Sequence, residues 1–317
     1  MTRVTLLAGG VGGAKMAEGL AALPGVDLTV IGNVADDDEF HGLWVSPDID
    51  TLSYSLAGLI DRRQGWGVAD EGHRALEVLA RLGQDCWMSL GDRDFGLHIW
   101  RTMRRMRGDR PSVIAADAAR ALGVGPRIVL PTDDRVQTRV RTDAGWLSFQ
   151  EYFVREKCAP EIRELRLDGI EAARPTPEAL AAIAEAEAIV IAPSNPLVSI
   201  APILAVPGIA EGLRQARVPR IAVSPFIAGK VVKGPADRMM AALGLRADAV
   251  GVAERYAGLA DVLVIDDLDS AHSAAIAARG LHPECRPILM RDQGDKQRLA
   301  AEVLEIARML AAREEVA

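Results

Sequence analysis

Short apolar runs alternate with longer Ala- and Leu-rich segments along most of the chain, the pattern of buried strands followed by helices. The apolar runs predict strands at residues 3–8, 28–32, 86–90, 127–130, 187–192, 220–224, 261–266 and 286–290. The segments between them predict helices at about 14–22, 51–60, 71–82, 95–106, 112–122, 177–186, 207–216, 235–243, 269–279 and 294–313. This alternation is typical of an α/β fold with a doubly wound, mostly parallel sheet and helices on both faces.

One stretch breaks the alternation. Polar and β-branched residues before the turn Asp143-Ala144-Gly145, and Trp146 after it, predict an antiparallel hairpin. We therefore expect a small antiparallel, β-rich insertion at residues 135–170 beside the main sheet. Residues 201–260, with Pro and Gly at their borders, are a candidate helical cap. No repeat or low-complexity linker divides the chain, so residues 1–317 are interpreted as a single α/β domain.

Composition and charge narrow the classes of protein. Of the 317 residues 49% are hydrophobic, which suffices for a buried core, but no apolar run approaches the ~20 residues that a membrane span needs. The N-terminal residues lack the apolar region of a secretory signal, so we expect a cytoplasmic protein with no membrane partner. A net charge of −7 argues against nucleic acid as a partner. Cys86, Cys158 and Cys285 lie far apart and are expected to be reduced thiols.

A glycine-rich turn follows the first predicted strand and precedes a helix, in the segment Gly9-Gly10-Val11-Gly12-Gly13-Ala14-Lys15. Four glycines let the backbone approach a ligand whose negative charge lies at a helix N-terminus. The segment matches neither GxGxxG nor the Walker A loop. A tight turn without a ligand is the alternative, but the lysine favours a phosphate-binding loop made by Gly9, Gly10, Gly12, Gly13 and Lys15.

Acidic residues cluster after the second predicted strand and before the helix that follows it. Asp36-Asp37-Asp38-Glu39 follows the second strand, and Asp48 and Asp50 come in the turn before a predicted helix. Carboxylates at the carboxyl edge of a parallel sheet suit Mg²⁺, which commonly binds one or two of them together with substrate phosphates. A solvated acidic loop is the alternative for the first run. Asp50 or Thr51 could instead cap the helix, and the role of Asp48 is left open.

Three later segments carry polar groups at strand ends. Asp94, His98 and Arg101 are spaced to share one helix face, and Arg93 precedes them. An isolated histidine is more often structural, but these neighbours favour a functional group. Ser194-Asn195 and the stretch from Lys230 to Lys233 follow two other strands and offer donors for an anion.

In this order the segments resemble the 2-phospho-L-lactate transferase family, the CofD-like enzymes of coenzyme F-420 biosynthesis. The resemblance covers nearly the whole chain. It rests on residues 9–15, 33–37, 46–51, 90–94 with His98 and Arg101, 133–135, 149–154, 192–196, and 224–225 with 229–230.

The resemblance implies a Mg²⁺-dependent transferase that acts as a homodimer. It would move a phospho-acid (2-phospholactate, or an enolpyruvyl or phosphoglyceryl equivalent) from a guanylyl diphosphate donor to the deazaflavin Fo, with release of GMP. Phosphoryl transfer of this kind depends on positioning and charge neutralisation. Which acid the donor carries is not decided by the sequence.

The implied roles fall into four groups. Asp37 and Asp50 are the expected metal ligands, with Asp36 in reserve. Asp50, Arg93 and His98 are the expected catalytic residues, with Asp50 also orienting the attacking hydroxyl. Fo would bind Asp50, Thr51, Arg93 and Asp94, and the insertion bearing Gln150 and Glu151 would close over it. The nucleotide and its phosphates would bind Gly9, Gly10, Gly12, Gly13, Lys15, Ser194, Asn195 and Lys230.

Two other functions compete with this one. A nucleotide-sugar-binding regulatory protein of the related gluconeogenesis-factor type shares the glycine loop and the acidic segment, but segments 46–51, 91–94 and 149–151 argue against it. A nicotinamide dehydrogenase would use Asp36 or Asp37 to bind the ribose. The departure from GxGxxG and the additional carboxylates argue against that reading.

Overall fold

The computed structural model describes residues 1–314. Within this part of the chain, seven parallel strands form the main sheet in the order β14-β13-β10-β9-β1-β2-β5. Because every strand runs the same way, their carboxyl ends share one edge of the sheet. The strands are β1 (Thr2–Ala8), β2 (Val26–Gly32), β5 (Arg127–Val129), β9 (Ala188–Ile191), β10 (Arg220–Val223), β13 (Val262–Ile265) and β14 (His282–Cys285).

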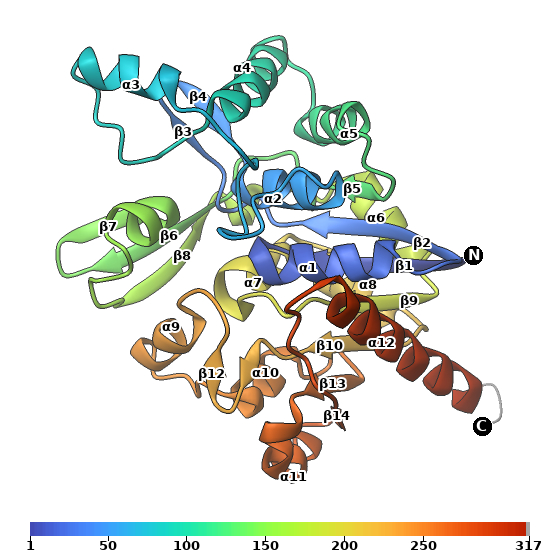
Figure 1. Ribbon diagram of the computed structural model, residues 1–317. Helices are drawn as coiled ribbons and strands as arrows, with labels where there is room; N and C mark the ends of the chain where they lie inside the picture. Colours follow the sequence, from blue (N-terminus) through green and yellow to red (C-terminus); the bar gives the residue numbers. More distant parts are fainter. Residues whose placement is uncertain (315–317) are drawn as a thin grey trace.

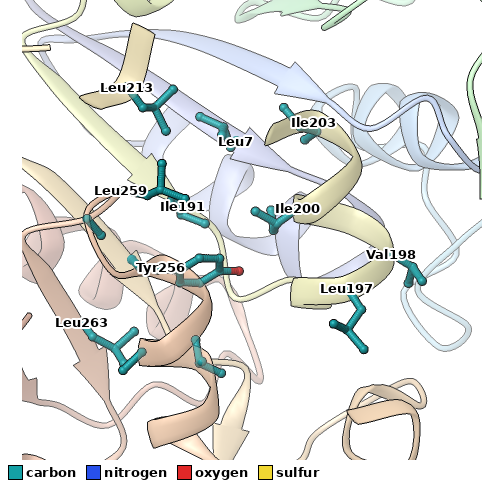
Figure 2. Close-up of a cluster of buried hydrophobic side chains, with 14 of the residues drawn as sticks. Leu7, Ile191, Leu197, Val198, Ile200, Ile203, Leu213, Tyr256, Leu259 and Leu263 are labelled. Carbon is teal, nitrogen blue, oxygen red and sulfur yellow. The ribbon is translucent and has the colours of Figure 1, made fainter. Parts of the chain in front are cut away.

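Helices cover both faces of this sheet (Figure 1). Successive residues of β1 show why, since Leu6 and Leu7 are both fully buried but belong to different hydrophobic clusters. The cluster around Leu6 is closed by α1 (Gly10–Ala21), α2 (Pro47–Leu56), α5 (Pro111–Ala121) and α12 (Gln293–Glu314). The cluster around Leu7 is closed by α6 (Pro177–Ala184), α7 (Ala201–Ala205), α8 (Ile209–Gln215), α9 (Ala236–Ala242) and α10 (Ala249–Tyr256), and part of it is drawn in Figure 2.

The insertion is a separate antiparallel sheet of the order β7-β6-β8. Its strands are β6 (Gln137–Thr142), β7 (Gly145–Ser148) and β8 (Glu164–Asp168), and they lie to one side of the main sheet (Figure 1). The predicted fold class, a doubly wound parallel sheet with a small antiparallel insertion, is therefore confirmed. Residues 201–260, the candidate helical cap, contribute β10 to the middle of the main sheet.

The remaining elements are one longer helix, α4, and several short helices and strand pairs outside the main sheet. They are β3 (Asp38–Phe40) paired with β4 (Leu43–Val45), α3 (Arg74–Arg81), α4 (Asp92–Met106), β11 (Phe226–Ile227) paired with β12 (Lys230–Val231), and α11 (Ser273–Ala277). Single turns of 3₁₀- or π-helix cover Glu151–Arg155, Ile170–Ala172, Pro196–Ile200 and Asp267–His272.

Several predicted elements are wrong. Residues 86–90 are irregular, because Trp87, Met88 and Leu90 pack with Phe40 and Phe95 away from the main sheet and need no strand to be buried. Residues 286–290 are also irregular, and the edge strand is β14 instead. The predicted helix at 269–279 is divided between a 3₁₀ turn and α11. Sequence patterns missed α10 and the helical segment 196–205.

The helix expected at 51–60 begins four residues earlier, at Pro47, with Ser46 in the N-cap position. Asp48 and Asp50 therefore lie in its first turn, and neither Asp50 nor Thr51 caps it.

No single helix within residues 1–314 is long and apolar enough to cross a membrane. One pair of helical segments, Pro196–Ala205 and Ile209–Gln215, is long and apolar enough only when its two parts are added together, and the two parts are bent by 84° relative to each other. In this structure its apolar side chains pack into the core beside Leu7.

Candidate functional site

A cavity of about 580 Å³ opens at the carboxyl edge of the main sheet. Its floor comes from the segments that follow β1, β2, β9 and β10, the usual place for a ligand in an open α/β sheet. Other walls come from α2, α4, the insertion and the segment 231–236. The sequence motifs at separate strand ends therefore meet around one space.

The first turn of α1 lines this cavity through Gly10, Val11 and Gly12, and its N-cap residue, Gly9, provides no capping side chain. Gly10 has a positive φ of 60°, a conformation that favours glycine. Lys15 also lines the cavity, and its ammonium donates to the carbonyl of Met290 at 2.7 Å. Burial, then the charge of Lys296, lowers the pKa of Lys15. A helix N-terminus with glycine as its N-cap, beside a lysine, is suited to an anionic ligand.

The other glycines of the turn serve packing. A Cβ at Gly9 would lie 2.6 Å from Oδ2 of Asp48, and one at Gly12 would collide with the carbonyl of Pro193. Gly13, which lies behind the cavity wall, is equally confined. Close approach of neighbouring segments of the chain thus requires three of the four glycines whether or not a ligand binds.

Asp36 and Asp48 both line the cavity, and both are buried. Asn33 holds Asp48 by donating to its Oδ2 at 2.9 Å. Burial raises the pKa of Asp48 to about 6. Burial, then the charge of Asp48, raises the pKa of Asp36 well above its usual range. Oδ1 of Asp36 has no hydrogen-bond partner within residues 1–314.

Asp37 lies outside the cavity wall in the described chain. Its Oδ2 accepts hydrogen bonds from Ser46 Oγ at 2.7 Å and from Trp44 Nε1 at 3.2 Å. Its Oδ1 is buried and, among the described residues, unpartnered. Burial raises the pKa of Asp37 to about 7. The structure thus turns this expected metal ligand toward β4 instead of the cavity.

Asp50 lines the cavity but is already paired. The guanidinium of Arg101 donates to both of its oxygens, with 3.0 Å between Nη1 and Oδ2. Arg101 is only 5% exposed, so the ion pair is closed to solvent. The same Nη1 lies 3.2 Å from Nδ1 of His98, one turn away on α4. Burial lowers the pKa of His98.

Asp94 and Tyr54 complete this corner of the cavity. Burial raises the pKa of Asp94, which accepts a hydrogen bond from the N–H of Gly91 at 3.3 Å. The hydroxyl of Tyr54 is buried without a hydrogen bond to any described residue.

The other expected residues divide between the cavity wall and its surroundings. Thr51, Ser194 and Asn195 line the wall, with Ser194 Oγ donating to the carbonyl of Gly9 at 2.7 Å. The structure does not bring Arg93 or Lys230 there: Arg93 donates to the carbonyl of Ala69 at 3.0 Å, and Lys230 is exposed in β12.

Sequence reasoning gave no role to several residues of the wall. Phe149 and Phe153 stack with ring centres 5.6 Å apart and 8° between their planes, and both belong to the lining of the cavity. Their spacing of four residues was a usable signal, but only the fold brings the insertion to the cavity. Trp66 was also missed, and Lys233 lies over its ring at 4.2 Å while donating to the carbonyl of Gln64.

Two carboxylates in the cavity lining have the chemistry that would suit a divalent cation. Within residues 1–314 no group of three or more His, Cys, Asp or Glu side chains is arranged to hold a metal ion. Mg²⁺ commonly needs fewer, because it keeps waters and binds one or two carboxylates together with substrate phosphates. Asp36, with its unpartnered buried oxygen, and Asp48 beside it supply such a pair.

The comparison with protein families gives one result for nearly the whole chain. The family model described as 2-phospho-L-lactate transferase CofD matches residues 4–303. The chain belongs to the 2-phospho-L-lactate transferase family. The family recognised from the sequence motifs is thereby confirmed.

Curated relatives of this chain are named for two different activities. A phosphoenolpyruvate transferase of Streptomyces coelicolor is 41% identical over 312 residues, which is 96% of this chain and 98% of the relative. A 2-phospho-L-lactate transferase of Methanopyrus kandleri is 39% identical over 312 residues, covering 97% and 98%.

One solved structure has a fold similar to that of this chain. A protein from Bacillus halodurans superposes with a TM-score of 0.63 over 96% of this chain and 99% of that one. The two sequences are 18% identical, so this likeness concerns the fold alone.

Proposed function

We propose that the protein transfers a phospho-acid from a guanylyl diphosphate donor to the deazaflavin Fo, releasing GMP and forming a precursor of coenzyme F-420. Family membership across residues 4–303 supports a transferase of this pathway. The relatives named for phosphoenolpyruvate and for 2-phospholactate are nearly equally similar, at 41% and 39% identity. The acid on the donor is therefore left to experiment.

The observation that carries the proposal is that two kinds of group line one cavity. Lys15, Lys233 and the first turn of α1 suit a diphosphate. The stacked rings of Phe149 and Phe153 suit a planar ring system. A phosphate donor and an aromatic acceptor would thus lie side by side, as a transfer between them requires.

Mg²⁺ is part of the proposal. Asp36 and Asp48 would hold it, because both line the cavity and Asp36 has an oxygen free to coordinate. When bound, the ion would neutralise charge on the donor phosphates. Asp37 and Asp50 stay predictions as metal ligands, and the pairing of Asp50 with Arg101 favours a role for Asp50 in orienting the acceptor.

The chain's own groups account for the rest of the transfer. Lys15, Lys233 and the first amides of α1 would hold the donor phosphates in place. Asp50, Tyr54 and His98 would place the ribityl hydroxyl of Fo for attack on the phosphorus, and the apolar rings would exclude water. Positioning of this kind supplies most of the catalysis in phosphoryl transfer.

The test is incubation of the purified protein with Fo, Mg²⁺ and guanylyl diphosphate donors of the three acids, with product masses read out. We expect GMP and one coenzyme F-420 precursor, formed best from one donor. Absence of product from all three donors, with retained binding of a nucleotide sugar, would instead support the regulatory function. The homodimer belongs to the same proposal and is checked by light scattering during size-exclusion chromatography.

A further inference from the structure

We propose that Arg101 is a positioning residue that fixes His98 as a hydrogen-bond donor, through Nε2, to an oxygen of the acceptor substrate. The identity of that substrate rests on the proposed function. The arrangement of the side chains does not.

The guanidinium of Arg101 has hydrogen-bond donors and no acceptor. Nη1 of Arg101 lies 3.2 Å from Nδ1 of His98, so this contact is a hydrogen bond only if Nδ1 accepts. In a neutral imidazole the proton must then be on Nε2. The partner thus selects one of the two tautomers.

Asp50 does not compete for that nitrogen. Its nearest oxygen lies 3.8 Å from Nδ1 of His98, beyond hydrogen-bond distance, and both of its oxygens accept from Arg101. This differs from a carboxylate that holds an imidazole as a general base, where the acid accepts the proton of Nδ1. Here Asp50 accepts hydrogen bonds from Arg101, and Arg101 in turn donates to the imidazole of His98.

The opposite edge of the ring is available to a ligand. His98 lines the cavity, and within residues 1–314 its Nε2 neither forms a hydrogen bond nor is sealed away as a buried unpartnered atom. The charged groups that act on the ring are Asp50 on α2 and Asp94 and Arg101 on α4. An N–H directed at the cavity donates and cannot accept a proton from an attacking hydroxyl, so His98 orients the acceptor instead of deprotonating it.

Arg101 acts through His98 and Asp50, because it is 5% exposed and lies behind the cavity wall. Arg104 is a matched control on the same helix, since it pairs with Asp109 and Asp117 away from the cavity.

The direct test is long-range ¹H–¹⁵N NMR of protein labelled at histidine. The chain has five histidines, and the spectrum of His98→Gln assigns the signal. We expect the Nε2–H tautomer in the wild type and in Arg104→Lys, and a loss of that tautomer preference in Arg101→Met. Should Arg101→Met fail to fold, Arg101→Lys replaces it, because an ammonium lacks the planar fork that reaches Asp50 and His98 together. An Nδ1–H tautomer in the wild type, or an unchanged ring in the Arg101 variant, would overturn the proposal.

Kinetics with Fo give an independent readout. His98→Leu should raise the KM for the acceptor or lower kcat by about tenfold or more, since it removes a donor in a buried site. His98→Gln keeps an N–H donor and should recover much of that loss. Equal inactivity of the two variants, or full activity of His98→Leu, would contradict a donor role. The tautomer is measured without turnover, so failure of the proposed function leaves that result intact.

Discussion

Two sets of buried carboxylates face the same cavity and differ in their counter-charges. Asp50 has the guanidinium of Arg101 on both of its oxygens. Asp36 and Asp48 form no ion pair with any residue in 1–314, and Asp48 is held by the neutral amide of Asn33. The pKa values of Asp36 and Asp48 are both raised, first of all by burial.

The difference distinguishes a carboxylate that supports the protein's own side chains from carboxylates that are available to bind a ligand. A buried charge is costly unless it is paired, and a folded chain that leaves one unpaired has a place for a cation from outside. Asp50 with Arg101 is a completed unit that holds His98 at the cavity wall. Asp36 and Asp48 form an incomplete unit, which a divalent cation and the donor phosphates would complete.

The largest expected effect comes from removing charge on the unpaired side. Asp48→Asn and Asp36→Asn keep the shape of the side chain, and we expect turnover to fall by about 10²–10³ or more, as for loss of transition-state charge stabilisation. Stability should be kept or raised, because the neutral amide removes the cost of ionising a buried carboxyl whose pKa is raised by burial. Steady-state kinetics and urea unfolding measure the two effects.

Asp38→Asn is the matched control for this experiment. Asp38 belongs to the same acidic run but is partly exposed, pairs with Arg135 and lies outside the cavity. Wild-type turnover in Asp48→Asn, or an equal loss in Asp38→Asn, would remove the distinction between the two sets.

The next effect concerns stability on the paired side. Arg101→Met should cost about 3–5 kcal/mol of unfolding free energy, because it leaves the charge of Asp50 buried without a partner. Adding Asp50→Asn should restore part of this loss. Urea unfolding measures both, with Arg104→Met as the control. Arg104 is partly exposed and its ion pairs are open to solvent, so a much smaller loss is expected there. Equal losses for the two arginines would contradict the pairing.

A pH dependence of stability should come from two buried carboxyls with raised pKa values, Asp48 on the unpaired side and Asp37 outside the cavity wall. The pKa of Asp37 is raised from 3.8 to about 7 and that of Asp48 to about 6, so the folded chain binds more protons than the unfolded chain within this window. Their contribution to stability is fully present below about pH 4 and is lost as the pH rises through about 6 to 7. In the absence of metal, thermal unfolding should show Asp37→Asn less sensitive to this rise than the wild type. An identical slope in both proteins would exclude Asp37 as a source.

The smallest effect calibrates the cost of an unpaired neutral group. The hydroxyl of Tyr256 is buried in the core with no partner among the described residues, surrounded by apolar side chains such as Ile191 and Ile200 (Figure 2). Tyr256→Phe should therefore leave the unfolding free energy unchanged or raise it by about 1 kcal/mol. A clear loss of stability would mean that the hydroxyl is satisfied in solution.

The comparison also shows what the sequence could predict. Segments at separate strand ends were expected to converge, and Gly10, Asp36, Asp50 and Ser194 do line one cavity, because parallel strands end at one edge. Which acid is paired could not be predicted, since Asp50 and Arg101 are 51 residues apart and meet only when α4 packs beside α2.

Two other features needed the structure for a similar reason. The roles of Gly9 and Gly12 depend on segments that approach them from elsewhere in the chain, Asp48 and the carbonyl of Pro193. The apolar run 86–90 had the composition of a strand, but it is buried against Phe40 and Phe95 without one. Local pattern predicted which segments matter more reliably than it predicted their contacts.

The most direct test of the account is a calorimetric titration of Mg²⁺ into protein saturated with GDP. The account predicts saturable binding in the wild type and in Asp38→Asn, and loss of that binding in Asp36→Asn and Asp48→Asn. Unchanged Mg²⁺ binding in both of the latter variants would contradict it.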